Sequence, residues 1–324
     1  MQETTTRRTT LHPSFRPFRD YLVTMVPLVI LATYVYGLRV LVMLAIATVT
    51  AVLCDLLVAL FQLRHIRLSD ISSVTLAWIV TLMLPVAASY GIVIFAVAAT
   101  VLLGSRAFGG YGNYPLHPSA FGFALTAISF PDAVFQFSKA STRVGLGWNL
   151  DVDLYQAPAG TLHDGGVPLL DRSDLLLGNF SGPMGETFCL LMFAGLILLI
   201  VHYANTAQEP LSFLVTCAFI AYYYPRVSAG GLESVLLEMF CTGIPYAACY
   251  LVAEPTVRPR HPVSKVLYGI LTGILTMLIA RYGVFERGAC FAVLLSVPFG
   301  YYLDRLFLAK KEEKEEKEVA DGEE

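Results

Sequence analysis

Two glycine-rich stretches interrupt the apolar sequence and hold the residues best suited to bind a ligand. The first, FGGYGNYPLHP at 108–118, contains Gly109, Gly110, Gly112 and Asn113. Glycine lets the backbone approach a ligand closely, and proline stops helices. The amide groups of this stretch and of the helix start after it can hold an anion or a flavin ring. A tight turn between two helices is the alternative interpretation.

The second stretch, LGNFSGPMGET at 177–187, leads into another apolar segment. Its candidate ligand-binding residues are Gly178, Asn179, Gly182, Gly185 and Glu186. One interpretation is a re-entrant turn lined for a ligand. The other is an ordinary helix start, in which Glu186 interacts favourably with the positive end of the helix dipole.

Two acidic residues lie inside apolar segments, Asp55 and Glu238. A charged side chain within a bilayer is costly, so each is a functional-site hypothesis by default. We therefore treat both as candidates for an ion path. The alternative for Asp55 is a structural pair with a loop arginine such as Arg64, and Glu238 has a similar alternative.

Cysteine usage argues against a metal centre. The six cysteines lie singly in apolar segments, without a Cys-x-x-Cys motif or a Cys/His cluster. Zinc or iron–sulfur ligation by this chain alone is therefore not expected. We expect the cysteines to pack among apolar side chains instead.

The elements that must position these residues are membrane helices. The chain has 324 residues, of which 56% are hydrophobic and 15% charged. A soluble domain carries about 25% charged residues, and a spanning helix needs about 20 apolar ones. We expect an all-α integral membrane protein with about ten transmembrane helices. The candidate spans are 21–37, 39–61, 70–87, 90–104, 118–131, 186–204, 211–225, 233–252, 265–281 and 288–308.

Five candidate spans precede the long polar loop and five follow it, so two similar halves would have opposite topology. Ten helices without internal symmetry are the alternative. Lys and Arg place both termini in the cytoplasm, and the first span would act as an uncleaved insertion signal. The expected parts are a cytoplasmic arm (1–20), a first half (21–131), an extracytoplasmic loop (132–185), a second half (186–308) and a disordered charged tail (309–324).

A third motif, AEPTVRPRHP at 253–262, completes a recognisable set. With the two glycine-rich stretches, in this order, the chain resembles the family of the D subunit of the Rnf complex. That family also includes the B subunit of the sodium-pumping NADH:quinone reductase. The resemblance extends over the last two helices, from Tyr268 to Arg305, and covers nearly the whole chain.

The resemblance implies a subunit of a bacterial or archaeal inner-membrane complex that couples ferredoxin:NAD electron transfer to Na⁺ or H⁺ translocation. It also implies FMN attached by a phosphoester to a threonine in the outer loop, and a second, non-covalent flavin such as riboflavin. Thr161 occupies the expected place, but AGTL replaces the family's GATPL; Thr142 is a weaker candidate. Implied partners are flavin and iron–sulfur subunits of the complex, a flavin transferase and membrane lipid; no nucleic acid is expected. The chain would not be catalytic alone.

Two rival functions remain open. A 5+5 bundle with glycine-rich half-helices also suits a channel or a secondary transporter for a small solute. A scaffold subunit without flavin is the second rival, because the threonine motif is altered. Bound flavin would distinguish the flavin-carrying subunit from both rivals.

Overall fold

The computed structural model describes residues 15–62, 70–139, 142–148, 152–202 and 207–321. Within them the protein is almost entirely helical. The first part comprises α1 (Phe15–Tyr36), α2 (Arg39–Gln62), α3 (Ser72–Leu82), α4 (Tyr90–Ala98) and α5 (Pro118–Ser129). The middle part comprises α6 (Pro131–Val134), β1 (Phe137–Ser138), β2 (Leu154–Tyr155), α7 (Pro158–His163) and α8 (Arg172–Leu177). The last part comprises α9 (Cys189–His202), α10 (Gln208–Tyr223), α11 (Gly231–Cys241), α12 (Ile244–Ala247), α13 (Pro262–Tyr282) and α14 (Ala289–Asp321).

The helices support a multi-pass membrane protein, although not every expected span is long enough to cross a bilayer. Among the described residues, five helices have the length and apolar character of a span. A sixth results if α11 and the helix from Ile244 to Val252, which meet at a bend of 58°, are taken together. The apolar helices α3, α5 and α9 are shorter, with 11, 12 and 14 residues. The expected number of ten spans is therefore not established by helix length.

Breaks in the helices have local causes. The bend between α11 and α12 lies at Gly243, whose φ of +72° is left-handed backbone that favours glycine. π-helical turns continue α4 from Ala99 to Ser105 and α12 from Ala248 to Val252. Such turns often occur at functional sites. The second ends directly before the 253–262 motif, and the first leads through a 3-10 turn, Arg106–Phe108, into the 108–118 motif. Both motifs therefore lie at helix ends.

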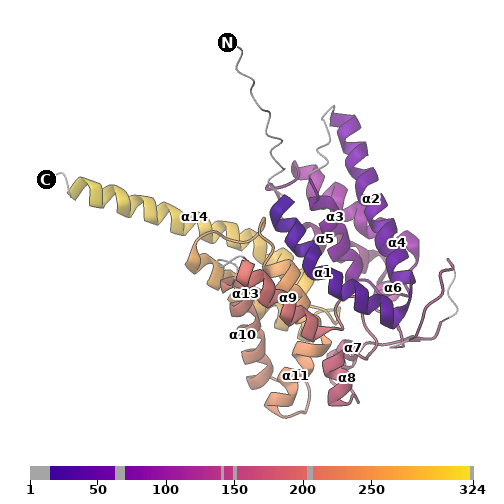
Figure 1. Ribbon diagram of the computed structural model, residues 1–324. Coiled ribbons are helices and arrows are strands. Elements are labelled where there is room, and N and C mark those ends of the chain that lie inside the picture. The colour runs from indigo at the N-terminus through magenta and orange to yellow at the C-terminus, as the bar shows by residue number, and fades with distance from the viewer. Residues whose placement is uncertain (1–14, 63–69, 140–141, 149–151, 203–206, 322–324) are drawn as a thin grey trace.

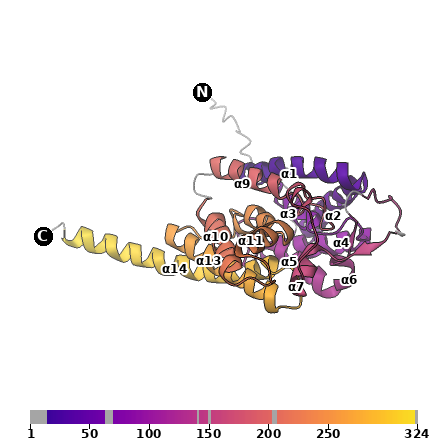
Figure 2. The same ribbon diagram turned by 90° about the horizontal axis from the view of Figure 1, so that it is seen from below.

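The two sets of membrane helices pack in corresponding ways. In the first set α2 packs on α3 and α4, and the continuation of α4 packs on α5. In the second set α10 packs on α11 and α13, and α13 packs on α14. Between the sets α1 lies beside α9, as Figures 1 and 2 show, and α5 contacts α14.

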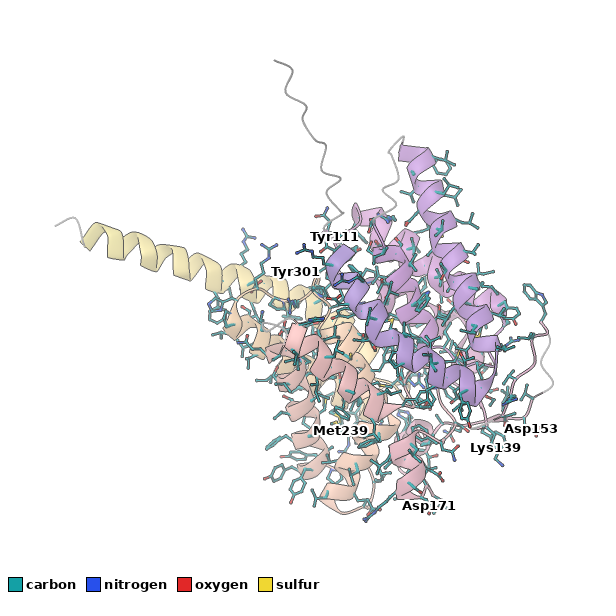
Figure 3. All side chains as sticks on the ribbon, viewed as in Figure 1. Tyr111, Lys139, Asp153, Asp171, Met239 and Tyr301 are labelled. Carbon is teal, nitrogen blue, oxygen red and sulfur yellow. The ribbon has the colours of Figure 1, made fainter. Side chains whose placement is uncertain are left out.

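The bundle has two ends, which we name after their most informative residues. The Arg106 face carries Arg106 and the loops 105–117 and 253–261, and Tyr111 and Tyr301 lie toward it in Figure 3. The Thr161 face carries α6, α7, α8 and the loop 283–288, which lie at the other end of the bundle in Figure 1.

Helix α14 extends well beyond the bundle (Figure 1) and reaches Asp321.

Many large apolar side chains of the outer helices are exposed, including Tyr34 on α1, Phe61 on α2 and Val201 on α9, each more than 70% exposed. In water such a surface would be unfavourable, whereas lipid tails are as apolar as these side chains. The core between the helices is filled with small and aromatic residues, which include Ala47, Ala77, Tyr246 and Tyr250. The exposure pattern agrees with a bundle surrounded by lipid.

Candidate functional site

Thr161, the expected point of flavin attachment, lies on the short helix α7 and is not itself one of the residues that line the nearby pocket. Pro158 occupies the first turn of α7, where its fixed φ suits a helix start. Thr161 is half-buried. Its neighbours Gly160, His163 and Asp164 line a pocket of about 560 Å³ on the Thr161 face. The pocket also includes residues from α6, from β2 and from the loop after α13.

Stacked aromatic rings form one wall of this pocket, which we call the Thr161 pocket. The rings of Phe135 and Phe285 are 5.1 Å apart at an interplanar angle of 17°. Phe285 also stacks on Phe291 at 5.3 Å and 8°. His163 connects α7 to the end of α13 through a contact of 3.0 Å between its Nδ1 and the carbonyl of Ala280. The wall is therefore flat, apolar and connected to a long helix.

A buried carboxylate faces the same pocket. Glu286 lies in the loop between α13 and α14, is only 7% exposed, and lines the pocket. Within the described part of the chain its Oε1 accepts no hydrogen bond, and the nearest cationic group is Nε of Arg287 at 4.0 Å. A Cβ at position 160 would meet Oε2 of Glu286 and the side chain of Gln156, so these side chains would have to shift. Burial raises the pKa of Glu286 to about 7, although the charges of Arg287 and His163 oppose that shift.

This carboxylate predicts a pH dependence of stability. The pKa of Glu286 is about 7 in the folded protein against 4.5 ordinarily. Ionisation of this carboxyl group therefore destabilises the folded protein relative to the unfolded chain. The contribution of protonated Glu286 to the free energy of unfolding is complete below pH 4.5 and is lost as the pH rises through 7. Its upper bound is about 3 kcal/mol. We expect Glu286→Gln to reduce the fall in thermal midpoint between pH 5 and pH 8. An equal fall in both proteins would contradict this assignment.

The first glycine-rich stretch lies at the opposite end of the molecule. Gly109, Gly110 and Gly112 all have left-handed backbone, with φ of +99°, +84° and +88°. The amides of Gly109, Gly110 and Asn113 donate to carbonyls of residues 106, 105 and 110. These three amides therefore donate within the loop and are not free for a ligand in this conformation. Asn113 is exposed.

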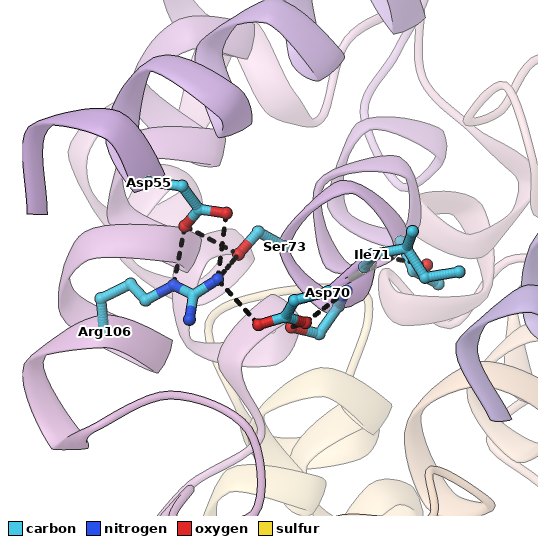
Figure 4. A network of polar contacts seen from close by, with 7 residues as sticks. Asp55, Asp70, Ile71, Ser73 and Arg106 are labelled. Atoms are coloured by element: carbon cyan, nitrogen blue, oxygen red, sulfur yellow. Dashed lines mark hydrogen bonds and ion pairs between the residues drawn. The ribbon is translucent and has the colours of Figure 1, made fainter. Parts of the chain in front are cut away.

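Arg106 connects this loop to α2 and to the start of α3 (Figure 4). Its Nε and Nη2 donate to the two carboxylate oxygens of Asp55 at 2.7 and 3.0 Å. Nη2 also contacts Ser73 at 2.9 Å and Asp70 at 3.3 Å. A Cβ at position 110 would approach Nη1 of Arg106 to 2.8 Å. Asp55, a candidate for the ion path, is thus neutralised by a bidentate arginine, while Arg64 lies outside the described residues.

The second glycine-rich stretch serves two different purposes. Gly178 ends α8 with a φ of +76°, and Asn179 donates through Nδ2 to Asp174 at 3.0 Å. From Gly182 onward the chain is buried and not helical until Cys189. The amide of Gly185 donates to the carbonyl of Leu82 at 2.8 Å, at the end of α3. This non-helical backbone is buried in protein, which is the condition for its presence at membrane depth.

Glu186 lies where the broken ends of three segments meet. Its carboxylate is 3.5 Å from Nη1 of Arg287, which also donates to the carbonyl of Met83 at 3.3 Å. Oε2 of Glu186 packs against Gly243, where no side chain would fit. The ends of α3 and α11 and the start of α9 therefore converge on one buried ion pair.

Glu238, the other candidate for the ion path, is part of a second buried pair. Nε and Nη2 of Arg226 donate to its two carboxylate oxygens at 2.5 and 2.6 Å. The two side chains are 4% and 2% exposed. Nη1 of Arg226 donates to the carbonyl of Ala280 at 2.6 Å, which connects the pair to the end of α13.

The structure thus separates residues that the sequence grouped together. The glycines of the first stretch lie on the Arg106 face, whereas Gly178 to Glu186 run from the Thr161 face into the core. Thr142 lies in the loop 142–148, away from α7 in sequence. Sequence reasoning missed Glu286, Arg287 and Arg226, which sit at the ends of apolar segments and resemble ordinary loop charges. The sequence feature that could have identified them is a charged residue directly next to a predicted helix break.

Comparison with known proteins supplies the family. The model of the NQR2, RnfD, RnfE family matches residues 12–311. The protein named as the D subunit of the ion-translocating oxidoreductase complex in Mannheimia succiniciproducens is 25% identical, with 84% of this chain and 86% of that protein covered. The proteins of the same name from Pseudomonas paraeruginosa and Yersinia enterocolitica are 26% and 24% identical, covering 83% and 84% of this chain and 83% and 86% of their own lengths. The family match extends over both sets of membrane helices and all three motifs, so this chain belongs to the NQR2, RnfD, RnfE family.

Proposed function

We propose that this chain is the flavin-carrying membrane subunit of an ion-translocating oxidoreductase complex. The named relatives are subunits of such a complex, and this chain shares most of their length. The proposal includes FMN joined through a phosphoester to Thr161 and a second flavin held without a covalent bond. The coupled ion is Na⁺ or H⁺, and the complex is located in the inner membrane.

The Thr161 pocket is the observation that carries this proposal. Its volume of about 560 Å³ is within the range of about 300–1,000 Å³ that small-molecule sites have. A flat ring system would find the stacked rings of Phe135 and Phe285 on one side. Oε1 of Glu286 is a buried acceptor without a hydrogen bond among the described residues, so it offers a partner for a ring N–H. The residues present therefore fit the group that the resemblance implies.

The residues of this chain have distinct roles in that arrangement. Thr161 would anchor the phosphate, and Phe135 and Phe285 would orient the ring. The absence of a side chain at Gly160 lets Glu286 approach the backbone of α7. The flavin itself would supply transfer of one or two electrons, while the protein sets its position and electrostatic environment.

For the membrane part we propose ten spans in two inverted halves with both termini in the cytoplasm. The corresponding packing of α2–α5 and α10–α14 supports two related halves. Each half holds a helix broken beside the Glu186–Arg287 pair, as expected where discontinuous helices of inverted repeats meet. This pair, more than Asp55 or Glu238, lies between the halves, so coupled ion movement would pass near it.

Bound flavin is the measurement that tests the proposal. The chain is purified from a membrane and separated in detergent from the other subunits of its complex. It is then denatured with acid, and the pellet and supernatant are assayed for flavin fluorescence. Flavin in the pellet supports covalent attachment, and flavin in the supernatant supports the second site. Flavin in neither fraction would overturn the proposal in favour of a transporter or a bare scaffold. A flavin transferase must be present in the host, because attachment depends on it.

A further inference from the structure

A second large pocket, of about 690 Å³, opens on the Arg106 face, away from the Thr161 pocket. We call it the basic pocket. Four cationic side chains and two tyrosines line it: Arg258, Arg260, Lys265, Arg305, Tyr111 and Tyr301. They come from the glycine-rich loop of the first half, the 253–261 loop, α13 and α14. A ligand there would touch both halves of the molecule.

The acid that lines the pocket is already engaged. The carboxylate of Asp304 accepts the amides of Arg260 and His261 at 2.5 and 2.9 Å. It therefore holds the 253–261 loop against α14, and two of its acceptor positions are already occupied. Tyr301 donates to the carbonyl of Tyr114 at 2.6 Å, which holds the tyrosine at the pocket wall.

Carboxylates near the pocket do not balance its positive charge. Nη1 of Arg258 is 3.4 Å from buried Glu209. Glu254 accepts the amides of Thr256 and Val257 at 3.1 Å each, and burial raises its pKa to about 7. Even with Asp304, Glu209 and Glu254 all ionised, the four cations exceed the carboxylates by one.

Two of the cations project into the opening. Arg260 and Arg305 are exposed, and neither forms an ion pair within the described part of the chain. A guanidinium group presents paired N–H donors that match the oxygens of a phosphate. Two such groups around one concave site therefore favour a phosphate group over a single-charged carboxylate.

The two helices that contribute to the pocket also carry exposed apolar side chains, which we call the apolar flank. On α13, Val263, Val266 and Leu267 are 46%, 38% and 38% exposed. On α14, Phe299 and Leu306 are 56% and 49% exposed. A site with a cationic head and an apolar flank at the end of a membrane bundle has the chemistry of a phospholipid site.

We propose that the basic pocket binds a phosphate group, and that the apolar flank favours one carried by an anionic phospholipid. The phosphate lies between Arg260 and Arg305, and the acyl chains lie along α13 and α14. Since the pocket joins the first glycine-rich loop to the second half, the bound lipid stabilises the contact between the halves. This site is separate from the Thr161 pocket and does not depend on flavin.

The test is binding to the full chain in detergent micelles. Cardiolipin, phosphatidylcholine and inorganic pyrophosphate are titrated separately, and bound ligand is counted by native mass spectrometry. Each of Arg260→Gln and Arg305→Gln should weaken cardiolipin binding roughly fivefold, and the double variant about twenty-fivefold. Binding should also weaken as salt is raised. Arg172→Gln, an exposed arginine on α8 at the Thr161 face, is the matched control and should bind as the parent does.

The outcomes separate the two sources of phosphate. Cardiolipin binding that depends on Arg260 and Arg305 supports a lipid headgroup. Pyrophosphate binding with the same dependence, without cardiolipin binding, supports the phosphate site with a soluble ligand. Equal binding by the parent and the double variant, or equal binding of phosphatidylcholine and cardiolipin, overturns the proposal.

Discussion

Replacement of Thr161 by alanine is expected to abolish covalent flavin on this chain. The parent chain, purified from a host with a flavin transferase, should have an intact mass larger by FMN less one water. A phosphoester needs a hydroxyl group, and alanine lacks it. Thr161 is half-buried on α7, so loss of its hydroxyl and methyl group should have a small effect on folding. Intact-mass spectrometry of the denatured chain measures the difference directly.

Two further variants serve as controls for the site of attachment. Thr161→Ser retains a hydroxyl group in the same place and should retain some FMN. Thr142→Ala removes the other candidate and should leave the added mass unchanged. Added mass that persists in Thr161→Ala would exclude Thr161 as the anchor. If the parent chain itself has no added mass, the covalent part of the proposal fails, and flavin released on denaturation would then be the remaining support.

The sequence was a good guide to the helices because apolar length depends on local composition alone. Each of the ten apolar segments corresponds to a helix or to a helix with its continuation. It was a poorer guide to where helices stop. The 70–87 segment contains α3, which ends at Leu82. There the carbonyls of Leu82 and Leu84 accept hydrogen bonds from the amides of Gly185 and Met184. That pairing joins residues about one hundred positions apart, so no local pattern reveals it.

The contacts of the candidate site residues were also not predictable from local sequence. Glycine-rich loops were recognisable as breaks, but a sequence does not show which amides remain free. In the first loop those of Gly109, Gly110 and Asn113 are used within the loop. Asp55 and Glu238 were recognisable as costly acids, yet their arginine partners are 51 and 12 positions away. The proximity of Glu286 to Gly160 of α7 depends on tertiary packing, so the sequence does not reveal it.

The buried pair of Arg226 and Glu238 leads to the largest stability effect that we expect. Arg226→Met leaves the carboxylate of Glu238 buried without its partner, and such a loss typically costs about 3–5 kcal/mol. The free energy of unfolding, from titration with sodium dodecyl sulfate in mixed micelles, should fall by about that amount. Arg19→Met is the matched control. Its guanidinium pairs with the neighbouring Asp20 but its side chain is 54% exposed, so about 0–1 kcal/mol is expected.

The double variant Arg226→Met/Glu238→Met separates the charge from the packing. With both charges removed, most of the stability should return, because replacement of a buried pair by apolar residues is often neutral. A residual loss of about 1–2 kcal/mol is expected, because Arg226 also donates to the carbonyl of Ala280 at 2.6 Å. If the double variant is as unstable as Arg226→Met, the loss comes from packing and the assigned role of the charge is wrong.

The same double variant decides whether Glu238 belongs to the ion path. A carboxylate held by two hydrogen bonds from one guanidinium cannot bind a passing cation unless Arg226 moves away. If the pair is structural, a folded double variant assembled into its complex retains ion translocation coupled to electron transfer. If Glu238 carries the ion, the double variant folds and transfers electrons but loses coupled translocation. The two hypotheses therefore predict different ion translocation by a double variant that is equally stable in both. Measuring stability and coupled translocation together shows whether the Arg226–Glu238 pair is structural or part of the ion path.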